Sequence, residues 1–345
     1  MTALDPLHAN SVIADNREKR APMIRRSNAF LQLAWQENAP LTITTILMLL
    51  AFIGSCLGVV FDQRIITGAP AWLKPAKFAI STAIYTGTMV WLFGYITIWP
   101  RLIRAVGWVM SLILVVEVGI IDIQTARGAT SHFNVGTPLD ATLFSIMGSF
   151  IALLWLTSMV VLVALFRQSF FNPSWGCALR TGMLLTVIGT GAGGMMLRPS
   201  PDQLEQIKIT HRPEIFGAHT VGAPDGGPGL PGLAWSRSHG DLRIPHFFGL
   251  HGIQIIPFSA FLLGRGRLST RQQTNVVLVA GSSYLALFLI LSWQALRGQS
   301  IVQPDTQTVI ALAVWLLGTV LTGALSLALT RSDLRQQAAA TTALS

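Results

Sequence analysis

Eight apolar runs of roughly 20 residues recur along the chain, and each is long enough to cross the hydrocarbon core of a bilayer. They cover about 41–61, 76–98, 104–124, 143–166, 175–197, 245–263, 274–296 and 306–330. Because lipid offers no hydrogen bonds to the backbone, such runs must form helices. Hydrophobic residues make up 51% of the sequence and charged residues 11%, which is outside the usual range for a soluble protein. The sequence therefore predicts an all-α, polytopic transmembrane helix bundle with about eight spans.

The distribution of basic residues predicts how this bundle is oriented. Fourteen of the 24 Lys and Arg residues lie in the termini and connectors of one side. The other ten lie on the opposite side, and five of these fall in one long connector where acidic residues match them. Short positively charged segments stay in the cytoplasm. We therefore expect both termini to be cytoplasmic and the protein to lie in the lipid bilayer of the inner (plasma) membrane.

The chain divides into one bundle and two polar ends. Residues 1–40 are predicted to form a disordered cytoplasmic tail, residues 41–330 a single transmembrane bundle, and residues 331–345 a second cytoplasmic tail. The long connector 198–244 lies on the outer side and contains 222-GAPDGGPGLPGL-233, which is too rich in Gly and Pro for a regular element. We expect it to be irregular, with short helical turns at most. Connectors of this length are usually functional or disordered.

Two general features exclude several classes of partner and cofactor. The net charge is +9, but the basic residues are spread over nearly every connector and form no patch, so no nucleic-acid partner is expected. Cys56 lies near the outer end of its predicted span and Cys177 near the cytoplasmic end of its own. The two thiols are therefore too far apart for a disulfide or a cysteine-ligated cluster. The sequence leaves the oligomeric state open, a homo-oligomer included.

Two carboxylates lie inside the predicted span 104–124, where a central Asp costs roughly 2.5–3.5 kcal/mol. With the outer boundary near Arg127, helix rise places Asp122 about 7 Å deep and Glu117 about 15 Å deep. Gln124 shares a helix face with Glu117, whereas Asp122 is rotated away by about 140°. Such groups form either a structural ion pair or a functional site. We expect them to line an outer-facing pocket.

The segment 72-WLKPAKF-78 places Lys74 and Lys77 three residues apart, on one face of a helix that begins there. Either both lysines extend to the lipid headgroups, or they face the pocket. In the second interpretation, Lys77 pairs with Asp122 at a similar depth. Arg198, which follows the span 175–197, is a second candidate partner.

The segment 239-HGDLRIPHFFGLHGIQ-254 has the densest cluster of His and charged residues in the chain. His251 and Gln254 share one helix face, and Arg243 lies at the outer start of the span. His246 points about 140° away from His251, which excludes the two-histidine pattern of a zinc-protease helix. Each histidine is either a hydrogen-bonded packing residue or a ligand.

The outer connector 124-QTARGATSHFN-134 adds Arg127 and His132 to the same side. Imidazole and carboxylate ligands suit zinc, iron or copper, and a haem would need two histidines at one level. The sequence therefore predicts an outer-facing pocket for a small-molecule ligand, with a metal ion or haem as the leading cofactor. The predicted ligands are His132, His246 and His251, which would make this a redox protein.

Two other functions compete with the redox prediction. One is a transporter or channel for a small solute, attracted by Lys74, Lys77, Arg198 and Arg243. The other is a membrane-embedded hydrolase in which a His and a carboxylate activate water. No catalytic residue is assigned, because the pattern does not single one out. Apart from Arg180, the cytoplasmic halves of the spans lack ionisable side chains, which favours chemistry confined to the outer side.

Three local patterns predict structure and not chemistry. The segment 189-GTGAGG-194 formally matches a dinucleotide-binding motif but follows no strand, so close helix packing is expected there. The segment 137-TPLD-140 predicts a helix cap, which gives Asp140 a structural role. Pro257 predicts a kink in the span 245–263.

Overall fold

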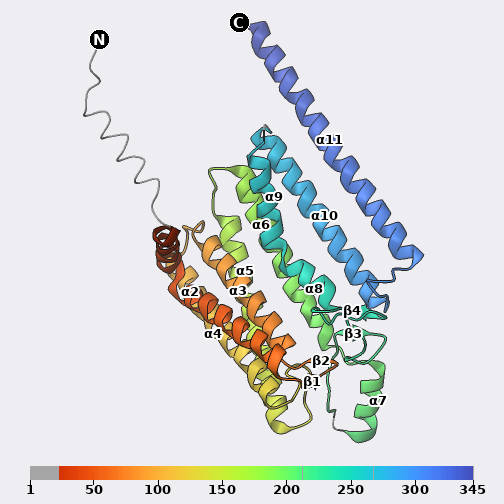
Figure 1. Ribbon diagram of the computed structural model, residues 1–345. Helices are drawn as coiled ribbons and strands as arrows, with labels where there is room; N and C mark the ends of the chain where they lie inside the picture. The colour runs from red at the N-terminus through yellow and green to blue at the C-terminus, as the bar shows by residue number, and fades with distance from the viewer. Residues whose placement is uncertain (1–22, 212, 267, 345) are drawn as a thin grey trace, which may run out of the picture.

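The computed structural model describes residues 23–211, 213–266 and 268–344 of the chain. The described chain is almost entirely helical, and its long helices run side by side as a bundle (Figure 1). The expected all-α fold is therefore confirmed. Residues 1–22 of the expected N-terminal tail lie outside the described residues.

The helices follow one another with short connections. They are α2 (Met23–Phe61), α3 (Leu73–Phe93), α4 (Pro100–Ala126), α5 (Pro138–Arg167), α6 (Pro173–Ala192), α7 (Pro201–Thr210), α8 (Arg243–Leu250), α9 (Gly252–Gly264), α10 (Thr270–Leu296) and α11 (Thr306–Leu344), with a 3₁₀ helix η1 (Gly193–Leu197). Two small antiparallel hairpins pair β1 (Ile65–Ile66) with β2 (Ala69–Pro70), and β3 (Thr220–Val221) with β4 (Gly240–Asp241).

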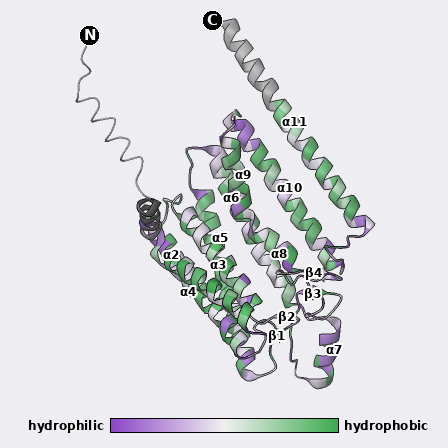
Figure 2. Ribbon diagram, in the orientation of Figure 1, coloured by the Kyte–Doolittle hydropathy of each residue, from purple (hydrophilic) through white to green (hydrophobic). Residues whose placement is uncertain are grey.

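Five described helices are long and apolar enough to cross a membrane: Gln32–Phe61 of α2, then α4, α5, α10, and Thr306–Leu329 of α11. The bent pair α8 and α9 makes a sixth if it is one span. These helices are mainly hydrophobic along their length, whereas α7 is largely hydrophilic (Figure 2). By length and composition the upper count is therefore six in the described chain, against the eight expected, because α3 and α6 are not among the helices that are apolar enough over 18 residues.

Most of the irregular connectors lie at one end of the bundle. The hairpins and α7 lie together at the lower end in Figure 1, and α2 and α11 run from there toward the opposite end. We call this lower end the loop end and define it as residues 62–72, 127–137, 198–242 and 297–305. Helix α2 begins at Met23 and α11 continues to Leu344, so helix extends into both segments expected to be tails.

The long connector is more ordered than its composition predicts. Helix α7 has ten residues and starts at a capping box formed by Ser200 and Gln203, which exceeds the short turns expected. The predicted cap of α5 is also confirmed: the Thr137 hydroxyl accepts a hydrogen bond from the Asp140 amide at 3.1 Å. The Gly- and Pro-rich part beyond α7 is irregular apart from β3 and β4, as expected.

Glycines allow α6 and α8 to lie in direct backbone contact. A Cβ on Gly189 would meet the backbone of Gly249, and one on Gly193 would meet the His246 ring at 3.1 Å. The prediction that 189-GTGAGG-194 serves close packing is therefore confirmed. This contact brings the loop ends of α6 and α8 together.

The span predicted over 245–263 is bent by 45° between α8 and α9. The break falls at His251 and not at Pro257, which lies inside α9. The Thr186 hydroxyl of α6 donates to Leu250 O at 3.1 Å and accepts from Ile253 N at 3.0 Å. One side chain thus satisfies backbone groups on both sides of the break, as membrane interiors require.

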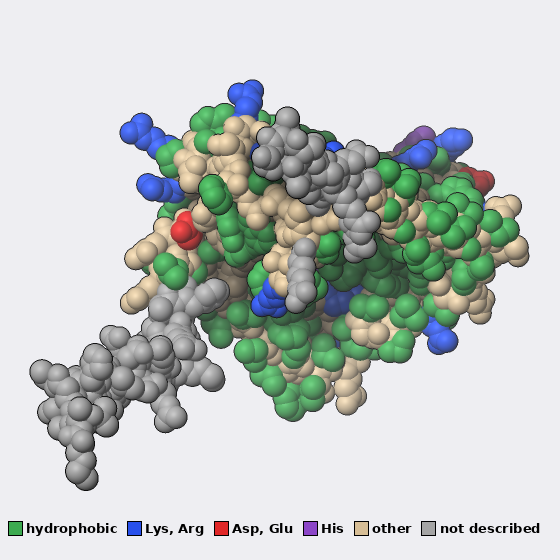
Figure 3. Space-filling view, turned by 90° about the horizontal axis from the view of Figure 1, so that it is seen from above, with side chains coloured by type: hydrophobic (Ala, Val, Ile, Leu, Met, Phe, Trp, Pro, Cys, Tyr) green, Lys and Arg blue, Asp and Glu red, His purple; other side chains and the backbone are tan. Residues whose placement is uncertain are grey.

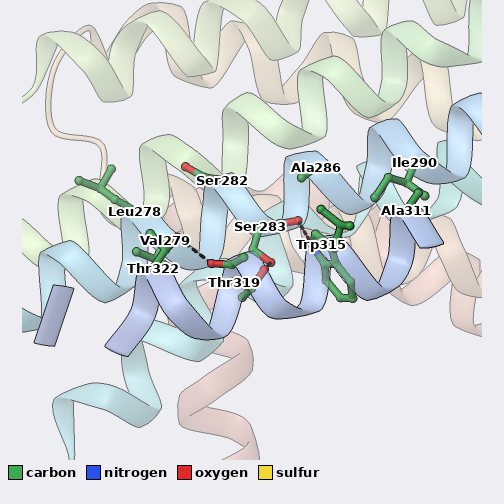
Figure 4. A pocket seen from close by; sticks show the side chains of 12 residues that line it. Leu278, Val279, Ser282, Ser283, Ala286, Ile290, Ala311, Trp315, Thr319 and Thr322 are labelled. Atoms are coloured by element: carbon green, nitrogen blue, oxygen red, sulfur yellow. Dashed lines mark hydrogen bonds between the residues drawn. The ribbon is translucent and has the colours of Figure 1, made fainter. Parts of the chain in front are cut away.

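Helix α11 lies at the edge of the bundle, against α10 (Figure 1). Between them is an open groove of about 620 Å³, lined mostly by apolar and small side chains (Figure 4). Ser283 and Thr319 share a hydrogen bond of 2.8 Å across it, and the Trp315 indole donates to Ser283 O at 2.8 Å. The groove holds no ionisable residue and is separate from the polar site described next.

Candidate functional site

Six ionisable side chains gather where the long helices meet the loop end. They are Lys74 of α3, Glu117 of α4, His132 of the α4–α5 connector, His219 and Asp225 of the long connector, and His246 of α8. Each of them interacts electrostatically with at least one other. We call these six residues the loop-end cluster. They come from five separate parts of the chain, so only the folded bundle assembles them.

Lys74 is at the centre of the cluster. The charges of Arg243, Asp225, Lys77 and Glu117 all act on it, and its ammonium lies 6.0 Å from the centroid of the Phe78 ring. It makes no hydrogen bond or salt bridge with the part of the chain that the structure describes. Lys74 is partly buried, and a partly buried cation normally has a partner, so this ammonium retains unused donors.

Lys77 has a different role from the one predicted. Its ammonium donates a hydrogen bond of 2.6 Å to Leu233 O and so fastens the long connector to α3. The predicted pair with Asp122 is wrong. Asp122 lies on the other face of α4, partly buried, and its Oδ1 has no hydrogen-bond partner among the described residues. It lies outside the loop-end cluster.

Glu117 is buried, with 3% of its surface exposed. Its Oε1 lies 3.9 Å from His132 Nε2, and its Oε2 has no hydrogen-bond partner in the described chain. Gln124 is fully buried on the same helix face, which confirms the predicted relation between these two residues. Glu117 is therefore the deep, incompletely bonded acid of the cluster.

Gln124 and Arg127 join α4 to α5 and do not line an open site. The Gln124 amide donates to Asp140 Oδ1 at 2.8 Å, and Arg127 forms a 2.9 Å salt bridge with the same oxygen. Arg127 also donates to Gln124 Oε1. Asp140 thus has the structural role expected of it.

His132 lies between aromatic rings in the α4–α5 connector. Its ring is 5.4 Å from that of Phe78, and its Nδ1 lies 3.2 Å from Ser131 Oγ. Burial, followed by the positive charge of Lys74, lowers its pKa well below 6.5. The side chain nevertheless keeps 20% of its surface exposed. His132 is therefore a neutral, recessed imidazole at pH 7.

His219 and Asp225 form a hydrogen-bonded pair at the surface of the cluster. The His219 Nδ1 lies 2.7 Å from Asp225 Oδ2, and the same carboxylate accepts from the backbone amides of His219 and Thr220. Burial lowers the pKa of His219, while these donors hold the pKa of Asp225 below its usual range. The carboxylate thus fixes a neutral His219 with its proton on Nδ1.

The sequence analysis missed both His219 and Asp225. The available signal was the stretch 219-HTVGAPD-225, in which an Asp in a Gly- and Pro-containing turn is positioned to accept backbone amides. Neither residue lies in an apolar run, where an ionisable group is conspicuous.

The side chains of His246 and His251 make contacts within and between helices. His246 Nδ1 lies 2.8 Å from Gly189 O on α6. His251 lies at the α8–α9 break with its ring 4.3 Å from that of Phe247. Gln254, expected in the pocket, donates a 3.1 Å hydrogen bond to Thr88 of α3.

The remaining predicted cations are paired or at the surface. Arg243 forms a two-pronged salt bridge with the buried Asp241, at 2.9 Å and 2.6 Å. It also donates to Ala234 O at 2.6 Å, which helps to hold the long connector. Arg198 is exposed. Of the basic residues predicted to attract a solute, Lys74 is thus the one that is both recessed and unbonded.

The arrangement does not fit the metal or haem site that the sequence predicted. Within the described ranges, no group of three or more His, Cys, Asp or Glu residues is placed to hold a metal ion. His246 and His251 are committed to packing, and the positive charge of Lys74 acts on His132. Cation binding beside this ammonium is electrostatically unfavourable.

Hydrolysis through a side-chain nucleophile differs from the predicted activation of water by a His and a carboxylate, and it would need an accessible hydroxyl at the cluster. Ser131 Oγ lies 3.2 Å from His132 Nδ1, but only 4% of the surface of Ser131 is exposed. A nucleophile must reach its substrate, so this contact is better explained as local support for His132.

Comparison of the chain with protein-family models, curated proteins and solved structures found no match. The function therefore has to be inferred from the chemistry of the loop-end cluster. That cluster combines one unbonded cation, one buried carboxyl group with an unused oxygen, and two recessed neutral imidazoles. These groups suit a small ligand that carries a negative charge.

Proposed function

We propose that the protein is a multi-pass membrane transporter that binds a small organic anion, such as a carboxylate, at the loop-end cluster. The observation that carries this proposal is the unbonded Lys74 ammonium. Lys77 and Arg243 are held by Leu233 O and Asp241, so Lys74 is the recessed cation left to receive a ligand. An ion pair formed in such a desolvated site is stronger than one in water.

The neighbours of Lys74 favour an anion of small size. His132 and His219 are neutral at pH 7 and offer ring nitrogens for hydrogen bonds without adding a second positive charge. The Phe78 ring beside Lys74 and His132 provides an apolar wall. One charge, a few polar contacts and an aromatic surface are typical of a small-molecule site.

The broken helix supports transport more than static binding. Many transporters bind substrate where a membrane helix is interrupted, because the break exposes backbone groups and permits movement. Here α8 carries Arg243 and His246 to the cluster, and the Thr186 hydroxyl bonds backbone groups on both sides of its junction with α9.

For this function we infer eight crossings, with both termini in the cytoplasm and the loop end outside the inner membrane. Helices α3 and α6 each bury about half of their residues against neighbours, so they can cross without being strongly apolar. The helix ends and connectors opposite the loop end carry Arg101, Arg104, Arg167 and Arg265, and Figure 3, which looks onto this end, shows several Lys and Arg side chains at the outline of the molecule. Such charge is typical of a cytoplasmic side.

Binding of a panel of small carboxylates to the detergent-purified protein tests the proposal. Acetate, lactate and succinate would be added while calorimetry and thermal stabilisation are measured. We expect at least one to bind, and Lys74→Gln to weaken that binding by about tenfold or more through loss of a charged partner. Lys77→Gln is the matched control, because it removes the same charge three residues away.

Uptake of the carboxylate that binds would then be followed in proteoliposomes. Equal binding by wild-type protein and Lys74→Gln would contradict the proposal, as would equal losses in Lys74→Gln and Lys77→Gln. Binding without uptake would identify a receptor and not a transporter.

A further inference from the structure

We propose that Glu117 exchanges a proton with the loop-end solvent through His132 and His219, and that anion binding at Lys74 is coupled to proton uptake by Glu117. The coupling rests on the proposed function. The proton path does not, because it follows from the arrangement of side chains alone.

The path begins at the Asp225–His219 pair. Asp225 and His219 keep 19% and 18% of their side-chain surfaces exposed, so solvent reaches them. The carboxylate fixes the proton of neutral His219 on Nδ1 and leaves Nε2 with a lone pair. A proton taken up on Nε2 creates an imidazolium that Asp225 stabilises at 2.7 Å.

The middle of the path is the pair of histidine rings. Their centroids are 6.4 Å apart and their planes are inclined by 33°. We place one water molecule between a nitrogen of each ring, because two hydrogen bonds of about 2.8 Å reach across about 5.6 Å. The Ser131 hydroxyl, 3.2 Å from His132 Nδ1, adds a second group able to relay a proton to that nitrogen.

The path ends where His132 Nε2 lies 3.9 Å from Glu117 Oε1. A slight side-chain movement would close this distance to a hydrogen bond. The transfer is balanced: His132 accepts a proton on Nδ1, releases one from Nε2 to the Glu117 carboxylate, and is left neutral in its other tautomer. Return of the proton along the same line restores the first tautomer, so no other reactant is needed.

The surroundings of Glu117 make its charge sensitive to a ligand. Lys74 of α3 is the cation that acts on it, and His132 approaches it from the α4–α5 connector. On α5, Asp140 is already neutralised by Arg127 and bonded to Gln124. When an anion occupies Lys74, Glu117 loses its compensating charge and gains a repelling one, which favours its protonated form.

Infrared spectroscopy tests the proton path without any ligand. We expect a carboxylic acid carbonyl band that responds to pH and disappears in Glu117→Gln. After a pH jump, His132→Phe and His219→Gln should slow the response of this band by tenfold or more. His211→Asn is the matched control, because His211 is an exposed histidine of the same connector. An unchanged rate in both path variants, or the absence of such a band, would overturn the path.

Proton counting tests the coupling. Addition of a bound carboxylate to weakly buffered protein should remove protons from the medium, and Glu117→Gln should bind the carboxylate without proton uptake. Wild-type binding without proton uptake would overturn the coupling while leaving the proposed function intact. A pH-responsive Glu117 band in a protein that binds no carboxylate would instead overturn the proposed function and the coupling, but not the path.

Discussion

Gly189 of α6 and Gly249 of α8 are so close that a Cβ added to Gly189 would lie 2.3 Å from Gly249 Cα. Backbone cannot move aside as a flexible side chain can, so any larger residue must push the two helices apart. Because α8 carries Arg243 and His246, this contact also sets the position of one side of the loop-end cluster.

We therefore expect Gly189→Ala to destabilise the protein by about 1–3 kcal/mol through overpacking. Gly194→Ala, in the same six-residue motif, should have little effect because nothing lies within 4 Å of its added Cβ. Thermal unfolding in detergent measures the difference. Similar melting temperatures for the two variants would show that the helix contact is less rigid than described.

A second prediction concerns the hydroxyl that bridges the α8–α9 break. Thr186→Val keeps the side-chain volume but leaves Leu250 O and Ile253 N without this partner, at a cost of about 1–3 kcal/mol for each unsatisfied group. Thr186→Ser should restore most of the loss. Thr190→Val is the control, because the Thr190 hydroxyl bonds within its own helix, to Thr186 O at 2.8 Å. Thermal unfolding of the three variants would reveal whether the bridge matters.

A third prediction follows from the lowered pKa values of His219 and Asp225. For both groups the unfolded chain binds protons more readily than the folded protein, so stability falls as pH decreases. The loss should begin near pH 6.5 for His219 and near pH 4 for Asp225, which are about their unfolded values. The loss of stability should appear as faster hydrogen exchange at the Thr220 amide, which donates a 2.8 Å hydrogen bond to Asp225, as the pH is lowered. Asp225→Asn should raise this exchange at pH 7 and remove the acid part of its pH dependence.

A fourth prediction tests orientation by cysteine labelling in intact cells. In a Cys56→Ala, Cys177→Ala background, Gly227→Cys should react with a membrane-impermeant thiol reagent from outside. Gly264→Cys, at the opposite end of the bundle, should react only after the membrane is opened. Both sites have nothing within 4 Å of an added Cβ, so labelling should not disturb packing. Reaction of both sites from the same side would contradict the proposed topology.

Local sequence patterns predicted several elements well because their physics is local. The shared face of Glu117 and Gln124 follows from helix geometry, and the Thr137 cap and the glycine contact of Gly189 follow from residue size and hydrogen bonding. Each of these features depends on a few neighbouring residues or on the absence of a side chain.

The partners of charged residues were not predictable in the same way. Helix rise predicted the same depth for Lys77 and Asp122, but Asp122 lies on another face of α4. Lys77 instead donates a hydrogen bond to Leu233 O, 156 residues away. The membrane count differed because α3 contains two lysines and α6 contains an arginine with several Gly and Thr residues, so neither helix is apolar enough to be counted as a span. The His219–Asp225 pair depends on a turn whose conformation no periodicity reveals.

The long connector is fastened at points that are far apart in the chain. The Lys77 ammonium donates a hydrogen bond to Leu233 O, and the Ser300 hydroxyl donates one of 2.6 Å to Arg237 O. During synthesis, Lys77 emerges early and Ser300 only after α10 is complete. Closure of the Ser300–Arg237 contact is therefore a late event in biogenesis. Until Ser300 emerges, Arg237 O lacks this hydrogen bond, and this part of the long connector is more accessible to proteases and folding factors.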